Sequence, residues 1–206
     1  MPYELDHLVV CASDLSQGRL WAEGLLDVPL EPRGVHALMG THNHVVRLDV
    51  GSYIEVISVD PAAPKPEHAR WFGLNDFGGP PKLSNWVIRC DDLEEAWERA
   101  PANVGRIMAF ERGDYAWRML VPDDGKPLFD GCFPTFVEWN SPHPTAQLPH
   151  RDLRLRRLKL THPNATDLRA AIEPFVQAME HVSIGEGPVA SLQAEIGSAS
   201  GEIWIA

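Results

Sequence analysis

The chain has 206 residues, with 18 Lys plus Arg against 29 Asp plus Glu, so its formal net charge is −11 at pH 7. This length fits one large domain or two small ones, and 44% hydrophobic residues are typical of a globular protein rather than a disordered one. The acidic balance argues against nucleic acid or an anionic membrane surface as a partner. No apolar run approaches the roughly 20 residues that a membrane-spanning helix needs.

The cysteines and the first residues indicate the compartment. Cys11, Cys90 and Cys132 are an odd number and lack C-x-x-C spacing, which predicts free thiols in a reducing environment. The opening MPYELDHLVV lacks the basic and apolar segments of a secretory signal. Together these features predict a cytoplasmic protein.

An internal repeat organises the first two thirds of the chain. Residues 5–15 (LDHLVVCASDL) and residues 83–93 (LSNWVIRCDDL) align without a gap, with His7 on Asn85. Each copy reads as an apolar strand that leads into the N-terminus of a helix, because Asp and Ser residues that suit a helix cap follow the β-branched residues.

Each copy then continues through a helical pattern into β-rich sequence, and the last strands align as residues 52–56 on residues 135–139. The repeat therefore predicts two β-α-β-β-β modules, packed face to face or joined edge to edge, followed by strands and a helix. The predicted segments are module 1 at residues 1–62, a Pro- and Gly-rich linker at 63–80, module 2 at 81–145 and a C-terminal extension at 146–206.

Three ionisable side chains interrupt faces that are otherwise apolar in the predicted strands. Alternation of side chains puts His7, Glu55 and Glu138 on inner faces, together with Asn85. An imidazole and two carboxylates suit a divalent ion such as Zn²⁺, Ni²⁺, Co²⁺, Mn²⁺ or Fe²⁺, with Glu55 and Glu138 as candidate proton-transfer bases. Simpler alternatives remain: His7 can be a hydrogen-bonded residue at a strand end, and Glu55 can pair with Arg47.

The repeated segments, the GTHN of residues 40–43 and SYIEVISVDP at residues 52–61 resemble the glyoxalase-like domain subfamily of the vicinal oxygen chelate (VOC) superfamily. That superfamily includes glyoxalase I, extradiol dioxygenases, methylmalonyl-CoA epimerase and drug-resistance proteins. The resemblance implies an α+β fold of tandem βαβββ modules of the glyoxalase and bleomycin-resistance type, with a C-terminal α+β extension. It also implies metal ligands at the positions of His7, Glu55, Asn85 and Glu138. Asn85 departs from this pattern, because an amide is a weak ligand, and is expected to contact substrate instead.

The resemblance favours an enzyme, a divalent-metal-dependent lyase or isomerase that acts on a small oxygen-rich molecule without an organic cofactor. One alternative is a protein that binds or sequesters a small molecule without turnover, since an incomplete ligand set is compatible with no metal. Another is an extradiol-type dioxygenase that takes its second histidine from His42 or His44. A homodimer is compatible with the resemblance.

Further contacts to substrate are expected from His42 and Asn43, in the GTHN stretch, and from Arg118, because arginine binds carboxylates in a bidentate fashion. Arg118 can equally be a surface residue. The remaining histidines, His143 among them, are expected at the surface. Four aromatic residues can form an apolar wall for a ligand or attach the linker to the modules: Trp71, Phe72, Phe77 and Trp86.

Overall fold

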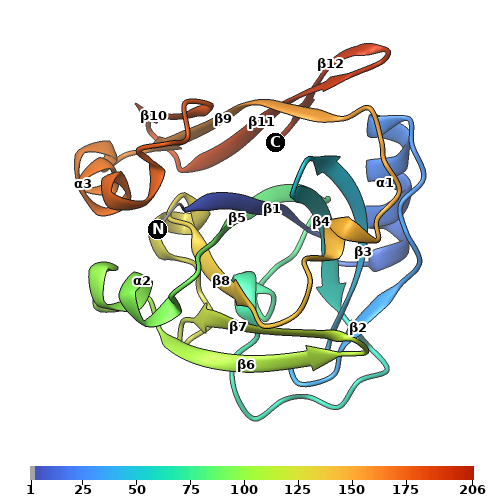
Figure 1. Ribbon diagram of the computed structural model, residues 1–206, viewed down its shortest axis with the longest axis horizontal. Helices are drawn as coiled ribbons and strands as arrows, with labels where there is room; N and C mark the ends of the chain where they lie inside the picture. The colour runs from blue at the N-terminus through green and yellow to red at the C-terminus, as the bar shows by residue number, and fades with distance from the viewer. Residues whose placement is uncertain (1–2) are drawn as a thin grey trace.

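The computed structural model describes residues 3–206 (Figure 1). The first elements are β1 (Glu4–Cys11), α1 (Leu15–Leu26), β2 (Gly34–His36), β3 (Thr41–Asp49) and β4 (Ser52–Val59). A short 3-10 turn, η1 (Trp71–Gly73), leads to β5 (Lys82–Arg89), α2 (Leu93–Arg99), β6 (Arg106–Arg112), β7 (Tyr115–Val121), η2 (Leu128–Gly131) and β8 (Thr135–Trp139). The last elements are η3 (Pro144–Ala146), β9 (Arg154–His162), α3 (Ala165–Val176), β10 (Val182–Glu186), β11 (Ser191–Ser198) and β12 (Gly201–Ile205). The predicted β-α-β-β-β order occurs twice.

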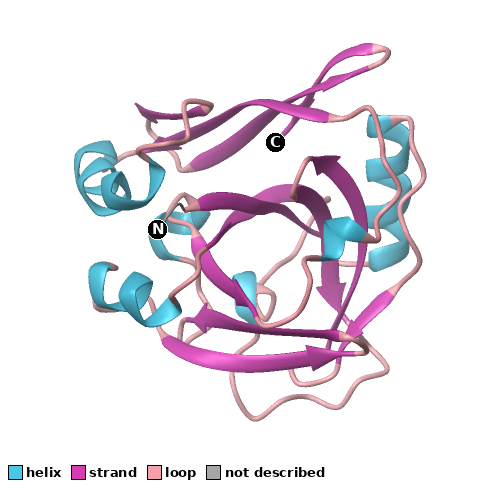
Figure 2. Ribbon diagram, viewed as in Figure 1, coloured by secondary structure: helices cyan, strands magenta, loops and turns pink. Residues whose placement is uncertain are grey.

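Eight strands form one strongly curved sheet in the order β2-β3-β4-β1-β5-β8-β7-β6. Within the first module β1 is parallel to β4, and within the second β5 is parallel to β8. The antiparallel pair β1 and β5 joins the modules edge to edge. The sheet therefore curls round an interior, and Figure 2 shows its strands enclosing a central space from several sides.

Both faces of the central strands are buried, which explains why their sequences are almost continuously apolar. On β1, Leu8 and Val10 belong to the core on the outer face of the large sheet, which the three helices cover. Val9 and Cys11 belong to a second cluster on the inner face. This alternation is the period-2 geometry of a strand. It makes the face of each residue depend on the register of its strand.

The caps of the first two helices occupy equivalent positions of the repeat. Asp14 accepts a hydrogen bond from the backbone N–H of Gln17, and Asp92 accepts one from that of Glu95, both at 2.8 Å. These side chains satisfy amide groups that have no partner within the helix, so the cap expected from the Asp and Ser residues at each helix start is Asp14 in the first module and Asp92 in the second. Within residues 3–206, no helix has both the length and the apolar character needed to cross a membrane.

The C-terminal strands form a second sheet in the order β10-β9-β11-β12, which lies over the outer face of the large sheet (Figure 1). Arg157 pairs with Glu195 and Leu155 pairs with Ile196, so Arg156 is an extra residue on β9. This bulge accounts for the change of apolar phase along the strand, from Leu153 and Leu155 to Leu158 and Leu160. Strand β10 runs parallel to β9.

Candidate functional site

A cavity of about 180 Å³ opens inside the curve of the large sheet. Its aromatic lining consists of Tyr53, Trp71, Phe72, Tyr115, Trp117 and Trp139. Its other polar and charged lining consists of His7, Glu31, His36, Asn43, Glu55 and Arg112. Both modules contribute to this lining, so the site depends on how β1 and β5 join them.

A β-bulge at the start of β1 brings two consecutive ionisable residues to the interior. Leu5 pairs with Ile88 and His7 pairs with Val87, so Asp6 is an extra residue on β1. Asp6 is fully buried, and its Oδ1 lies 2.6 Å from His7 Nδ1. Regular alternation would put Asp6 on the outer face with Leu8, so the bulge creates this pair.

The Asp6 carboxylate accepts three hydrogen bonds, from three different elements of the chain. Besides His7, the Trp139 indole Nε1 lies 2.9 Å and His143 Nε2 lies 3.0 Å from Asp6 Oδ2. His143 Nδ1 accepts from the Thr145 backbone N–H, which assigns the hydrogen to Nε2. Burial by itself would raise the pKa of Asp6, but the hydrogen bonds from His143 and His7 outweigh it and hold that pKa well below its usual range.

The ionised Asp6 fixes the tautomer of His7. Nδ1 carries the hydrogen that Asp6 accepts, which leaves Nε2 with a free lone pair. That nitrogen lies 3.6 Å from Glu55 Oε2. The imidazole is stacked on the Tyr53 ring at a centroid distance of 4.5 Å, so its orientation is held from two sides. The site thus presents an oriented imidazole beside a carboxylate.

Asn43 connects Glu55 to the guanidinium of Arg112. Its Nδ2 donates to Glu55 Oε1 at 2.6 Å, and its Oδ1 accepts from Arg112 Nη1 at 3.2 Å. Arg112 Nη1 also lies 3.3 Å from His36 Nε2. Burial, reinforced by the charge of Arg112, lowers the pKa of His36 to about 3, so this imidazole is neutral.

Gly34 permits the approach of Arg112 from the opposite end of the sheet. A Cβ atom at this position would overlap both Arg112 Nη1 and Asn43 Oδ1. Since β2 and β6 lie at opposite ends of the strand order, the absence of a side chain on β2 lets β6 deliver its arginine to the cavity.

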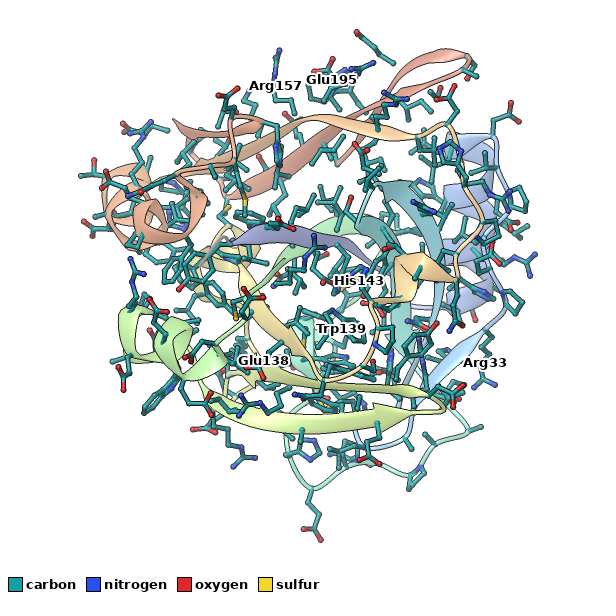
Figure 3. The ribbon with its side chains drawn as sticks, in the orientation of Figure 1. Arg33, Glu138, Trp139, His143, Arg157 and Glu195 are labelled. Atoms are coloured by element: carbon teal, nitrogen blue, oxygen red, sulfur yellow. The ribbon has the colours of Figure 1, made fainter. Side chains whose placement is uncertain are left out.

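Glu138, expected to share the site with Glu55, lies on the other face of the large sheet. Its Oε2 accepts from the backbone N–H of Leu93 at 2.9 Å and pairs with Arg118 at 2.7 Å. Figure 3 shows Glu138 on the α2 side of β8 and Trp139 toward the interior. The inner face of β8 therefore carries Val137 and Trp139, both of which line the cavity.

The register of the strands explains this difference. Val9 pairs with Glu55 in the first module, whereas Val87 pairs with Thr135 in the second. Because Val9 and Val87 are equivalent in the repeat, the counterpart of Glu55 is Thr135, three residues before Glu138. A shift by an odd number of residues moves a side chain to the opposite face, so the expected alignment of the two glutamates was wrong.

Three of the expected substrate contacts also lie outside the cavity lining, and only Asn43 is part of it. His42 is bonded to Arg33 Nε at 2.9 Å and to Ser58 at 2.8 Å. Arg118 pairs with Glu94 and Glu138 near α2. Asn85 is buried, with its Oδ1 accepting from the Trp86 backbone N–H at 2.7 Å.

The expected metal ligands do not form one site. Glu138 is absent from the cavity, and within residues 3–206 no cluster of three or more His, Cys, Asp or Glu side chains has an arrangement that would hold a metal ion. His36 Nε2 lies 4.0 Å from Glu55 Oε1, but it also contacts Arg112, whose positive charge disfavours a second cation there. The donors present therefore do not fit the divalent ion that the resemblance implied.

The sequence provides only weak signals that the residues around the cavity include four that were not expected there: Asp6, His36, Arg112 and His143. Asp6 is a charged residue inside an apolar strand, but alternation assigns it to the outer face. His143 was expected at the surface, yet it is partly buried and lies over the interior in Figure 3. His36 and Arg112 come from the strands at the two ends of the sheet, β2 and β6, and no local pattern brings them together.

Of the aromatic residues expected to form a wall, Trp71 and Phe72 line the cavity. Trp86 lies in the core on the outer face of the large sheet. Phe77 packs beside the inner-face cluster, away from the cavity. The linker therefore supplies part of the wall through η1, and Trp86 serves packing.

Comparisons with known proteins agree with this architecture. A hypothetical protein from Staphylococcus aureus has a similar structure, with a TM-score of 0.67 at 13% identity over 93% of this chain and 88% of that one. Methylmalonyl-CoA epimerase from Mycobacterium tuberculosis matches with a TM-score of 0.44 at 16% identity over 69% of this chain and 90% of that one. A variant of 4-hydroxymandelate synthase from Streptomyces coelicolor matches with a TM-score of 0.43 at 15% identity over 68% of this chain and 50% of that one.

A search of curated proteins finds no match. The similarity to the Staphylococcus aureus protein, at 13% identity, shows the fold alone. Residues 5–176, more than four fifths of the chain, match the family described as "Glyoxalase-like domain". The chain belongs to the glyoxalase-like domain family.

Proposed function

We propose that the protein is an enzyme, a lyase or isomerase that moves a proton within a small oxygen-rich substrate bound in the cavity. The observation that carries this proposal is the Asp6–His7 pair, in which Nδ1 is held at 2.6 Å and Nε2 is left free beside Glu55. An imidazole oriented by a buried carboxylate is a common form of general base.

The proposed chemistry uses groups that line the cavity, together with Asp6, which bonds to His7 Nδ1. His7 Nε2 removes a proton from a substrate carbon next to a carbonyl, and the electron pair of the C–H bond moves onto the carbonyl oxygen. Asp6 stabilises the imidazolium that forms, while the Arg112 guanidinium stabilises the negative oxygen. The proton returns to a different carbon or to a leaving group, either from His7 or through Glu55, which lies 3.6 Å from the imidazole.

Hydrogen exchange tests the proposal before the natural substrate is known. The protein is incubated in D₂O with α-hydroxy acids, α-keto acids and 1,3-dicarbonyl compounds, and loss of the C–H signals is followed by proton NMR. We expect exchange that His7→Gln abolishes and that His150→Gln, an exposed histidine, leaves unchanged. Exchange is scored only as the rate above that of a protein-free sample, because 1,3-dicarbonyl compounds and α-keto acids also exchange spontaneously. Catalysed exchange that persists in His7→Gln, or its absence across all three classes, contradicts the proposal.

A second candidate function, binding without turnover, is supported by the six aromatic residues in the lining. It predicts a compound that quenches the tryptophan fluorescence of the cavity but shows no exchange. The same samples therefore distinguish a binding protein from an enzyme.

A further inference from the structure

We propose that the cavity binds a carboxylate attached to a single planar ring, with the carboxylate on Arg112 and the ring against the indoles of Trp71 and Trp117. The proposal rests on the proposed function only in assigning the cavity to a substrate. It adds the chemical class of that substrate.

The volume of the cavity limits the ligand. An engineered protein cavity of about 150 Å³ with an apolar lining binds benzene. The cavity here measures about 180 Å³, which leaves room for one ring and one small substituent. Larger conjugates, such as a nucleotide, would have to extend out through its opening.

The charged end of the cavity selects an anion. The protein partners of Arg112 Nη1 are Asn43 Oδ1 and the neutral His36, so no carboxylate neutralises the guanidinium at these contacts. Glu55 accepts its hydrogen bond from Nδ2 of the Asn43 amide rather than from Arg112. A planar guanidinium with unused N–H groups matches the two oxygens of a ligand carboxylate.

The aromatic walls adjoin that charged end. The Trp71 and Trp117 rings lie 5.0 and 6.1 Å from the His36 ring, and His36 contacts Arg112. A ring bound against these indoles would therefore place its substituent within reach of the guanidinium. In addition, the buried indole Nε1 of Trp71 has no hydrogen-bond partner among the described residues, so it can donate to an oxygen of the ligand.

Four probes separate the contributions of charge and ring in the wild-type protein: benzoate, benzamide, cyclohexanecarboxylate and acetate. Binding is followed by quenching of tryptophan fluorescence. We expect benzoate to bind at least about tenfold more tightly than benzamide, which has the same shape without the charge, because hydrogen bonds to charged groups are the stronger ones. We expect acetate and the non-planar cyclohexanecarboxylate to bind more weakly than benzoate.

Two arginines on the same strand provide a matched pair of variants. Arg112→Gln should weaken benzoate binding by about 10- to 100-fold and remove the preference over benzamide. Arg106 is an exposed arginine on β6, with 59% of its side chain accessible. Arg106→Gln should leave the affinity for benzoate and the preference over benzamide unchanged. Circular dichroism checks that each variant is folded. If Arg112→Gln is unfolded, the four probes still decide the question in the wild-type protein.

Three results would overturn this assignment: no binding of benzoate, equal binding of benzamide and benzoate, or an undiminished preference for benzoate in folded Arg112→Gln. Its failure is separable from failure of the proposed function. Benzoate binding without exchange on any compound would overturn only the proposed chemistry, whereas exchange on an aliphatic compound without benzoate binding would overturn only the ligand class.

Discussion

Glu55 and Glu138 lie on opposite faces of the large sheet, although the alignment of residues 52–56 on residues 135–139 pairs them. Glu55 lines the cavity, whereas Glu138 caps the N-terminus of α2 through the backbone N–H of Leu93. One carboxylate is thus available for chemistry, and the other stabilises a helix.

These two positions should therefore respond differently to the same substitution. Glu138→Gln weakens a charged cap and the Arg118 ion pair, so we expect a loss of about 1 kcal/mol in the free energy of unfolding. The exchange of substrate C–H hydrogens should be retained in this variant. Glu55→Gln should slow exchange. Urea unfolding and the exchange assay measure the two effects, and loss of exchange in a stable Glu138→Gln protein would contradict the assigned faces.

Asp6 should contribute to stability at neutral pH. Its pKa is lower in the folded protein than in the unfolded chain, so its contribution is present above the ordinary carboxyl pKa and is lost as the pH falls toward the folded-state pKa. Asp6→Asn leaves His7 and His143 without their anion, and we expect it to cost about 3 kcal/mol near pH 7 and less in acid. Asp123→Asn, with 79% of the side chain exposed, is the control for urea unfolding.

His36 should make the protein sensitive to mild acid. The unfolded chain takes up a proton near the ordinary pKa of 6.5, whereas burial keeps the folded His36 neutral until the pH approaches about 3. The free energy of unfolding should therefore fall by about 2–3 kcal/mol from this residue alone between about pH 7 and about pH 4.5. Urea unfolding at the two pH values should show a smaller fall in His36→Gln. An equal fall in both proteins would contradict burial of a neutral imidazole.

Alanine at Gly34 should weaken benzoate binding, whereas alanine at Gly24 should raise the stability of the protein. Gly34→Ala places a methyl group where Arg112 and Asn43 meet, so we expect weaker benzoate binding although every charged group is retained. Gly24→Ala, on α1, has open space around the new methyl group and should stabilise the protein by about 1 kcal/mol. Fluorescence titration and thermal unfolding measure the two changes, and unaltered binding in Gly34→Ala would show that the guanidinium need not hold its position.

The sequence by itself determined the order of elements in the two modules and the presence of a cap at the start of each of their helices. Apolar β-branched runs, helical spacing and Asp residues at helix starts act within one segment, so Asp14 and Asp92 could be recognised without a partner strand. The repeat predicted the two β-α-β-β-β units because its strand and helix signals also lie within single segments. His7 and Glu55 were correctly assigned to the interior.

Only the tertiary structure decided which ionisable groups meet. A bulge turned Asp6 inward, and a three-residue difference in register turned Glu138 outward, because side chains alternate with a period of two and any odd shift reverses the face. Arg112 reaches the cavity from β6, and His143 reaches Asp6 from the segment after β8. Such contacts depend on pairing between strands distant in sequence, which no local pattern of residues specifies.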